Sequence, residues 1–252
     1  MKKKTLIMLL CVITAIAGTA FGTIAYLTDT DGVTNHFTIG NVTITVDEIK
    51  TDKAGKPVYP EGTALNPDGT PVDPLAQPER TEQGNEYQLI PGSEYTKDPT
   101  MTVKAGSEEA YVRMVVTITS AAELKEVFAQ LQATYPDKYP NGFLPEQHVT
   151  GWDNTVWQYE GASEDAAANT LTLEFRYATT VAAADDAPTV LPPLFKTIKV
   201  PGEMNNAQLQ TLADLTIDVQ GHAIQTTGFA DADAAWIAFD DQTKAEAAVQ
   251  TP

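Results

Sequence analysis

The sequence predicts a mainly β fold, an antiparallel sandwich with two or three inserted or peripheral helices. Many short segments alternate apolar and polar residues, as half-buried strands do. Clusters of Pro and Gly separate these segments, and helical periodicity is confined to a few stretches. We therefore expect one sandwich domain over residues 26–252, preceded by an export signal over residues 1–25.

Residues 1–25 have the order of charge and apolarity that is typical of a signal peptide. Residues 2–4 are lysines and are followed by an apolar run over residues 6–21. Thr23 and Ala25 place short side chains three and one positions before a scissile bond. We predict that a signal peptidase cuts between Ala25 and Tyr26, with a cut after Ala20 as the alternative.

An uncleaved segment over residues 5–25 would instead be long enough to cross a bilayer. No basic residues follow this segment to hold it in the membrane. We therefore expect a mature protein without a membrane span, located in the extracellular matrix or at the cell surface.

Composition excludes several classes of partner. The chain has 34 acidic and 16 basic residues and a net charge of −18, and loss of the signal lysines makes it more acidic. Such a surface repels polyanions, so nucleic acid is not an expected partner. Cys11 is the single cysteine and lies in the signal, so an ordinary apolar core must stabilise the mature domain, as suits a Gram-positive cell surface.

The first strand region after the signal alternates in two phases. Phe37 and Ile39 share one phase, and Val42, Ile44 and Val46 share the other, which predicts a bulge or kink at residues 40–41. Residues 50–98 are rich in proline, which cannot donate a hydrogen bond to a strand ladder. They predict a long loop or an ornamented hairpin excursion.

The middle of the chain combines strands with one helix. Residues 101–103 and 112–118 alternate strictly on either side of a turn at residues 105–108, which predicts two adjacent antiparallel strands. Ser120 and Glu123 then have the spacing of a capping box. The helix that they begin has apolar residues at 124, 127, 128 and 131 and ends before Pro136.

The C-terminal half predicts further strands and two helices. An aromatic segment over residues 152–159 and the alternating segments 171–177, 195–200 and 215–219 are expected strands. Residues 207–212 predict a short helix. Asp231 or Asp233 is expected to cap a longer helix that extends towards Val249.

Two sequence blocks carry a resemblance to a known family. The first is GTIAYLTDTD at residues 22–31 with NHFTIGNVTI at residues 35–44, and the second is LIPGSEYTKDP at residues 89–99. In these blocks the chain resembles exported bacterial proteins of the TasA/camelysin superfamily. The resemblance implies cleavage by a dedicated ER-type signal peptidase and a jelly-roll-like sandwich fold.

The TasA branch of this family implies a structural function in the biofilm matrix. A fibre subunit of this kind donates its mature N-terminal strand to a neighbour, whose free sheet edge offers unpaired amides and carbonyls. The candidate donated residues are Phe37, Ile39, Val42, Ile44 and Val46. The partners would be other copies or other matrix proteins. Alternatively, the same residues form an internal strand of their own monomer.

Enzymatic functions have little support in the residues. The camelysin branch implies a metallo-endopeptidase, but His36, His148 and His222 are far apart and lack the helical zinc-protease spacing. No Gly-x-Ser-x-Gly motif is present. We expect no catalytic residue, metal or cofactor; the second hypothesis is a surface adhesin that displays residues 50–98.

Two further patterns have simpler structural explanations. Acidic pairs at residues 29–31, 185–186 and 231–233 could bind calcium, but they lack the twelve-residue loop pattern and suit turns or helix caps. Trp152, Trp157 and Tyr159 could stack on a sugar, but mixed aromatic segments more often belong to a core.

Overall fold

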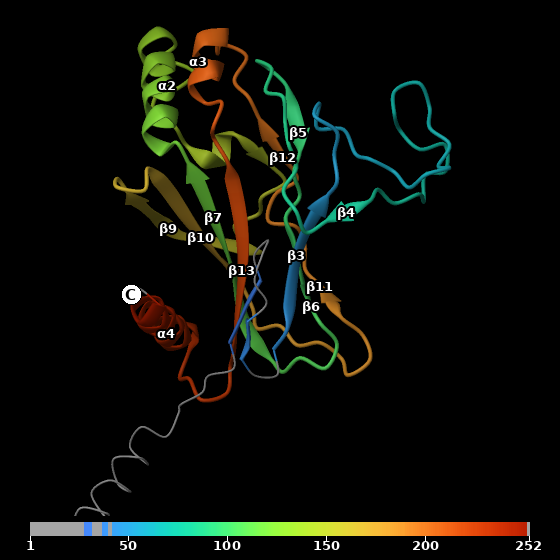
Figure 1. Ribbon diagram of the computed structural model, residues 1–252, viewed down its shortest axis with the longest axis vertical. Helices are drawn as coiled ribbons and strands as arrows, with labels where there is room; N and C mark the ends of the chain where they lie inside the picture. Colours follow the sequence, from blue (N-terminus) through green and yellow to red (C-terminus); the bar gives the residue numbers. More distant parts are fainter. Residues whose placement is uncertain (1–27, 32–36, 40–41, 251–252) are drawn as a thin grey trace, which may run out of the picture.

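The computed structural model describes residues 28–31, 37–39 and 42–250. This part of the chain is mainly β, and its named strands form three antiparallel sheets (Figure 1). The largest sheet has the order β2-β1-β13-β7-β10-β9. Its strands are β1 (Thr28–Asp31), β2 (Phe37–Ile39), β7 (Ala110–Thr119), β9 (Trp157–Asp165), β10 (Thr170–Tyr177) and β13 (Ile217–Gln225).

Two smaller sheets complete the β structure. The four-stranded sheet has the order β11-β6-β3-β4 and contains β3 (Ile44–Ile49), β4 (Arg80–Thr81), β6 (Thr100–Val103) and β11 (Thr189–Val190). The three-stranded sheet has the order β5-β12-β8, with β5 (Glu94–Thr96), β8 (Val149–Thr150) and β12 (Thr197–Lys199).

The core lies between the large sheet and the two smaller ones. Alternate residues of β7 and β10 face it, and they meet buried residues of β3 and β6. The inward side chains include Val112, Met114, Val116, Ile118, Leu171, Leu173, Ile44, Met101 and Val103. Each fully buried aliphatic side chain contributes about 1.5–3 kcal/mol, so this alternation accounts for the sandwich-like arrangement.

The helices are α2 (Ala121–Thr134), the short α3 (Asn206–Thr211) and α4 (Ala232–Gln250), with a 3-10 turn at Pro145–Gln147. All three α-helices were predicted, and α2 ends before Pro136 as expected. The Asp231 carboxylate accepts a 2.9 Å hydrogen bond from the Ala234 amide, so Asp231 is one of the two acids that we expected to cap α4.

The hairpin predicted between residues 101–103 and 112–118 is wrong. β6 pairs with β3 and β11, whereas β7 pairs with β13 and β10, so the two strands belong to different sheets. The turn between them, with Gly106 at φ +73°, crosses from one sheet to the other. Alternation shows which side chains of a strand are buried, but it does not show to which sheet the strand belongs. β6 and β7 face the same core from opposite sides.

The predicted capping box at α2 is also wrong in its chemistry. Ser120 has a left-handed backbone with φ 53°, and its side chain makes no capping hydrogen bond. Asn169, from the turn between β9 and β10, caps the helix instead. Its Oδ1 accepts from the Ala122 amide at 2.8 Å, and its Nδ2 donates to Glu123 at 2.7 Å.

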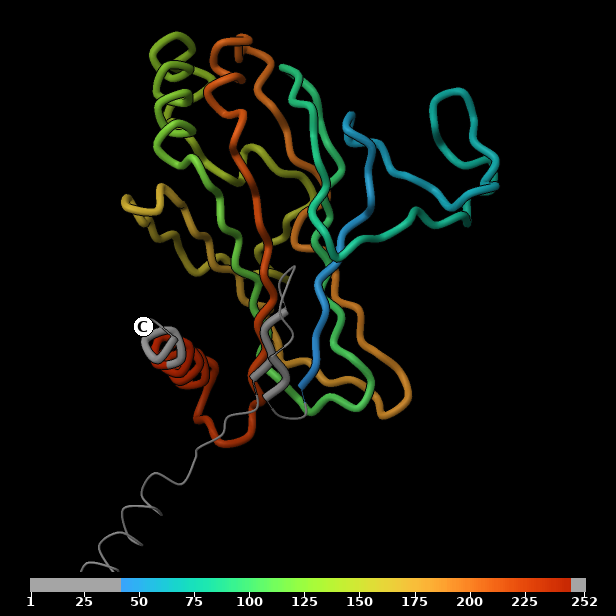
Figure 2. The backbone as a smooth tube through the Cα atoms, in the orientation of Figure 1, coloured from blue at the N-terminus to red at the C-terminus, as the bar shows by residue number. Residues whose placement is uncertain are grey.

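Of two other predicted segments, the aromatic one differs in part, and the proline-rich one is largely the loop that was expected. The aromatic strand begins only at Trp157, because Asp153 forms a turn: its carbonyl accepts from the Trp157 amide at 2.9 Å. The chain between β3 and β6 is largely irregular, and Figure 2 shows that its first half projects from the body of the molecule. The predicted kink at residues 40–41 lies outside the described residues.

Candidate functional site

The first candidate site is the edge of the large sheet where the N-terminal strands lie. β1 pairs antiparallel with β13 from Thr28 opposite Ile224 to Asp31 opposite Gly221. β2 pairs with β1 and is the terminal strand of the sheet order. Ala25 and Tyr26, the predicted cleavage residues, lie outside the described residues, but β1 begins two positions after Tyr26.

The five predicted strand-donation residues occupy two places. Phe37 and Ile39 are in β2, at the outer edge of the large sheet. Val42 and Ile44 are fully buried in the core, and Val46 is half-buried in β3. β3 itself pairs with β6 and β4 of the same chain. The structure therefore places two of the five at a sheet edge and three in the core.

β13 contacts both the N-terminal strand β1 and the core strand β3. Its Gly221 lies opposite Asp31 of β1, and side chains of the other sheet rest against it. A Cβ atom at Gly221 would lie 2.5 Å from Val46 Cγ2 and 2.8 Å from Met101 Cε. Glycine at this position allows β3 to approach the backbone of β13 closely.

Helix α4 is held against the outer face of the same sheet by a charged cluster. Arg113 of β7 is 4% exposed, and its Nε donates to His222 Nδ1 at 3.1 Å. Its guanidinium also pairs with Glu174 of β10 at 3.3 Å and with Asp240 of α4. The cluster thus links β7, β10, β13 and α4 through one buried cation.

Aromatic contacts complete the attachment of α4. The Arg113 guanidinium lies 4.4 Å from the Trp236 ring centroid and 5.0 Å from that of Phe239. Burial, reinforced by the charge of Arg113, lowers the pKa of His222 to about 3, so this imidazole is neutral at pH 7. Since His222 lies opposite Thr30 of β1, α4 and the N-terminal strand share the same stretch of β13.

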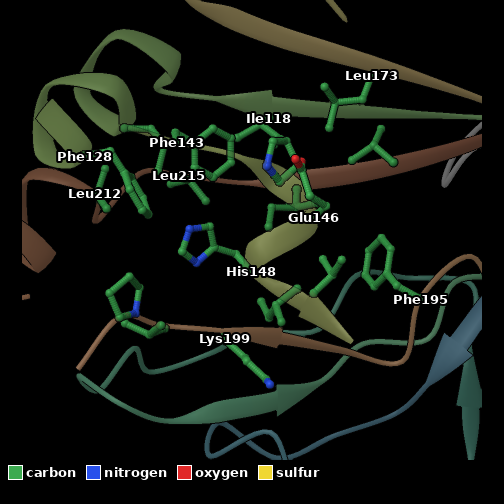
Figure 3. Close-up of a pocket in the computed structure, with 18 of the residues that line it drawn as sticks. Ile118, Phe128, Phe143, Glu146, His148, Leu173, Phe195, Lys199, Leu212 and Leu215 are labelled. Atoms are coloured by element: carbon green, nitrogen blue, oxygen red, sulfur yellow. The ribbon is translucent and has the colours of Figure 1, made fainter. Parts of the chain in front are cut away.

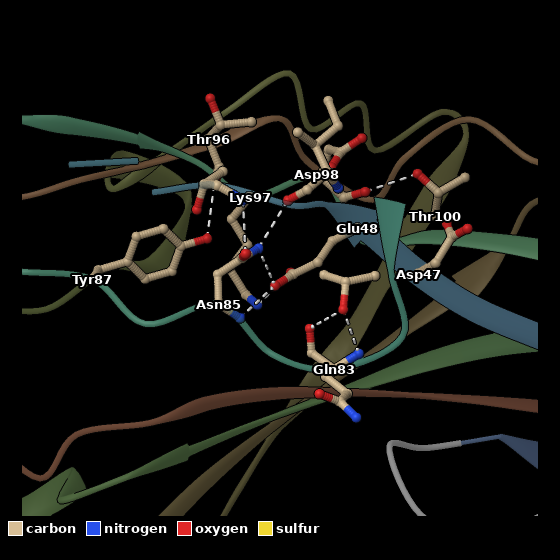
Figure 4. A network of polar contacts seen from close by, with 12 residues as sticks. Asp47, Glu48, Gln83, Asn85, Tyr87, Thr96, Lys97, Asp98 and Thr100 are labelled. Atoms are coloured by element: carbon tan, nitrogen blue, oxygen red, sulfur yellow. Dashed lines mark hydrogen bonds and ion pairs between the residues drawn. The ribbon is translucent and has the colours of Figure 1, made fainter. Parts of the chain in front are cut away.

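A second polar cluster fixes the base of the proline-rich excursion, as Figure 4 shows. Lys97 Nζ and Glu48 Oε2 are 2.7 Å apart, and both side chains are less than 10% exposed. Asn85 donates to Glu48 at 2.8 Å and to the Ile49 carbonyl at 2.8 Å. Buried charges require such pairing, so this cluster ties residues 85 and 97 to the end of β3.

The same region contains a second, more exposed set of ion pairs. Arg80 of β4 pairs with Asp98 at 2.8 Å and with Asp47 of β3 at 2.9 Å. The Tyr87 hydroxyl donates to the Thr96 carbonyl at 2.8 Å, and burial is the main reason that the pKa of Tyr87 is raised. These contacts hold the base of the excursion together, and its first half projects from this base (Figure 2).

Sequence analysis missed both clusters, although one signal was available. Glu48 continues the alternation of Ile44 and Val46, so a carboxylate occupies an apolar phase of β3. A charge in a buried phase indicates a buried partner, here Lys97. Arg113 gave no comparable signal, because it lies on the outward phase of β7, where residues of α4 pack over its guanidinium.

The two described histidines lie in different parts of the fold. His222 lies in the α4 cluster, His148 lies beside an apolar cavity, and His36 is outside the described residues. Among the described residues, no group of three His, Cys, Asp or Glu side chains is placed to hold a metal ion. Trp157 is 1% exposed, so it is a core residue and not part of a sugar platform.

In the described ranges, no helix combines the length and apolarity needed to cross a membrane. The chain matches no family model, no curated protein and no solved structure.

Proposed function

We propose that this chain is a secreted structural protein of the cell surface or biofilm matrix, whose copies assemble by exchanging their N-terminal strand. The main support is the position of β1: it follows the expected mature N-terminus directly and pairs with β13 near the sheet edge. The predicted export signal and the TasA-like sequence blocks support this proposal. A jelly-roll topology, which the resemblance implies, would also agree with it.

Strand exchange needs a short strand whose contacts another copy can reproduce. β1 has four residues and β2 has three, so few hydrogen bonds hold them to the sheet. If they detach, the β13 edge offers unpaired amides and carbonyls, and β1 of another copy can pair in the same register. Head-to-tail pairing of this kind propagates into filaments when the rotation between successive copies does not close a ring.

This mechanism divides the candidate residues by function. Phe37 and Ile39 would move with the donated segment, because they belong to β2. Val42, Ile44 and Val46 would remain in the core of their own chain, where they anchor the donor. Repulsion between mature copies, whose net charge is more negative than the −18 of the full chain, opposes assembly at low ionic strength, so added salt should promote it.

Electron microscopy of the purified chain 26–252 tests the proposal. The double variant Asp29→Pro with Thr30→Pro should abolish fibres. Adjacent residues of β1 direct their backbone amides to opposite neighbours, β13 and β2, so one of the two prolines removes a donor that faces β13. Thr30→Val, which keeps the amide, is the matched control. Fibres that form equally well with both prolines would contradict the proposal, provided that circular dichroism shows folded protein.

An adhesin is the second candidate, and the projecting excursion favours it. Leu65, Val72 and Leu75 are exposed on this segment, Leu75 to 80%. Exposed apolar side chains on a projecting segment suit contact with another surface. Replacing all three with Ser should abolish cell-surface adhesion and leave fibres intact if the excursion is the binding element; unchanged adhesion would exclude that function for it.

A further inference from the structure

An apolar cavity of about 150 Å³ lies between the large sheet, α2 and the three-stranded sheet. Figure 3 shows side chains around it from α2 and the large sheet, such as Phe128 and Leu173, and from connecting segments, such as Phe143 and Phe195. The exposed residues Glu146 and Lys199 also line it, so its mouth lies at their surface. An apolar cavity of about this volume accepts a molecule as large as benzene.

A buried polar atom without a partner interrupts the apolar part of the lining. His148 lies between the 3-10 turn and β8, and its Nε2 is buried without a hydrogen-bond partner within the described structure. Its backbone is fixed, because its amide donates to the Pro145 carbonyl and its carbonyl accepts from the Lys199 amide at 2.7 Å. Its ring is stacked on Phe143 and meets the edge of Phe128. The imidazole is thus held in place at the cavity wall.

An unpartnered buried nitrogen is unfavourable unless a ligand satisfies it. Burial lowers the pKa of His148 to about 4, so the ring is neutral at pH 7 and Nε2 either donates or accepts according to its tautomer. A water molecule needs two to four polar partners, and the apolar surroundings here provide few. A ligand hydroxyl bonds to either tautomer, and the rest of the ligand can fill the apolar space.

We propose that this cavity binds a small neutral molecule with a single ring and one hydroxyl group, and that His148 Nε2 bonds to the hydroxyl. Phenol-sized compounds fit the volume. A charged ligand is disfavoured, because a lone charge is costly to bury among apolar side chains. The binding site is distinct from the β1 edge and the proposal does not depend on fibre formation.

Fluorine NMR with 4-fluorophenol and fluorobenzene tests this proposal at pH 7, where both probes are neutral. The wild-type chain 26–252 should bind 4-fluorophenol roughly fivefold more tightly, the ratio that one net neutral hydrogen bond provides. His148→Phe should bind fluorobenzene and lose the preference for the phenol. Tyr159→Phe, which removes a hydroxyl from another wall of the same cavity, should keep the preference.

A cavity-filling variant locates the binding. Val149→Phe places additional atoms in the cavity from β8 and should weaken binding of both probes at least tenfold. If that variant does not fold, two measurements on the wild type replace it. They are competition between unlabelled phenol and 4-fluorophenol, and a change in the NMR signal of the His148 ring when the probe binds. Equal affinity for the two probes, no binding of either, or an unchanged preference in His148→Phe would overturn the proposal.

Discussion

Single charged residues in the Glu48–Lys97 pair have the largest expected effects on stability. Lys97→Met leaves the Glu48 carboxylate buried without its cation, and the free energy of unfolding should fall by about 3–5 kcal/mol. Chemical denaturation monitored by tryptophan fluorescence measures this change. Lys53→Met, which disrupts a pair whose side chains are 74% and 84% exposed, should have no measurable effect.

The double variant Glu48→Leu with Lys97→Met separates pairing from desolvation. It removes both buried charges, so it should be more stable than Lys97→Met alone. A double variant that is less stable than the single one would show that the surrounding hydrogen bonds, and not an uncompensated charge, determine the effect.

Gly221 provides a steric prediction at the place where the two sheets meet. Gly221→Ala should destabilise the fold by about 1–3 kcal/mol, because the new Cβ would overlap Val46 Cγ2. Adding Val46→Ala should recover part of the loss, since it removes the nearest atom. Gly84→Ala is the control, because no atom lies within 4 Å of a Cβ there. Equal effects of the two glycine changes in urea denaturation would contradict the close approach.

At the scale of elements, the N-terminal cap of α2 is Asn169 in the structure, whereas the sequence predicted Ser120. Asn169→Ala should destabilise the protein by about 1 kcal/mol, because it removes the side chain that accepts from the Ala122 amide. Ser120→Ala should change the unfolding free energy by no more than about 0.5 kcal/mol, since Ser120 makes no capping bond. Thermal unfolding of both variants measures the difference, and the reverse order would support the capping box.

Local patterns predicted elements well and their partners poorly. The alternation at 171–177 and the apolar face of the helix at 121–134 depend on neighbouring residues, so β10 and α2 were predicted correctly. Whether β6 pairs with β7 or with β3 depends on contacts between distant residues. The alternating pattern contains no information on that choice, and the turn at Gly106 suits either a hairpin or a crossing between sheets.

For the candidate site too, the sequence predicted strand residues but not the pairing of the strands. Sequence pattern identified Ile44 and Val46 as strand residues, and β3 contains both. It did not identify β13 as the partner of β1, because the paired residue that lies nearest to Asp31 in the sequence is Gly221, 190 positions away (221 − 31). Asn169 and Arg113 likewise act on elements far away in the sequence, and only the fold brings them together.

At the scale of the whole molecule, two neutral, partly buried histidines make stability depend on pH. The pKa values of His148 and His222 are about 4 and about 3 when folded, against about 6.5 when unfolded. The unfolded chain therefore binds more protons between pH 6.5 and pH 4, and stability falls as the pH decreases through that range. Each histidine contributes at most about 1.4 kcal/mol per pH unit.

Urea denaturation at pH 7 and pH 5 measures this dependence. The carboxyl groups with lowered pKa values, such as Glu203 and Asp153, lose their contribution only at lower pH, so they do not interfere. His148→Phe should reduce the loss of stability between pH 7 and pH 5. Equal stability at the two pH values would show that these imidazoles titrate normally in the folded protein.

Strand exchange is most directly tested by disulfide formation between two different chains. Residues 26–252 contain no cysteine, so single cysteines can be placed at Asp29 in one chain and at Ala223 in another, positions that lie opposite each other in the β1–β13 register. Under mild oxidation of fibres from an equal mixture, we predict a disulfide that joins an Asp29→Cys chain to an Ala223→Cys chain, identified by mass spectrometry. Fibres without this mixed disulfide would show that each copy keeps its own β1 and that assembly uses another surface.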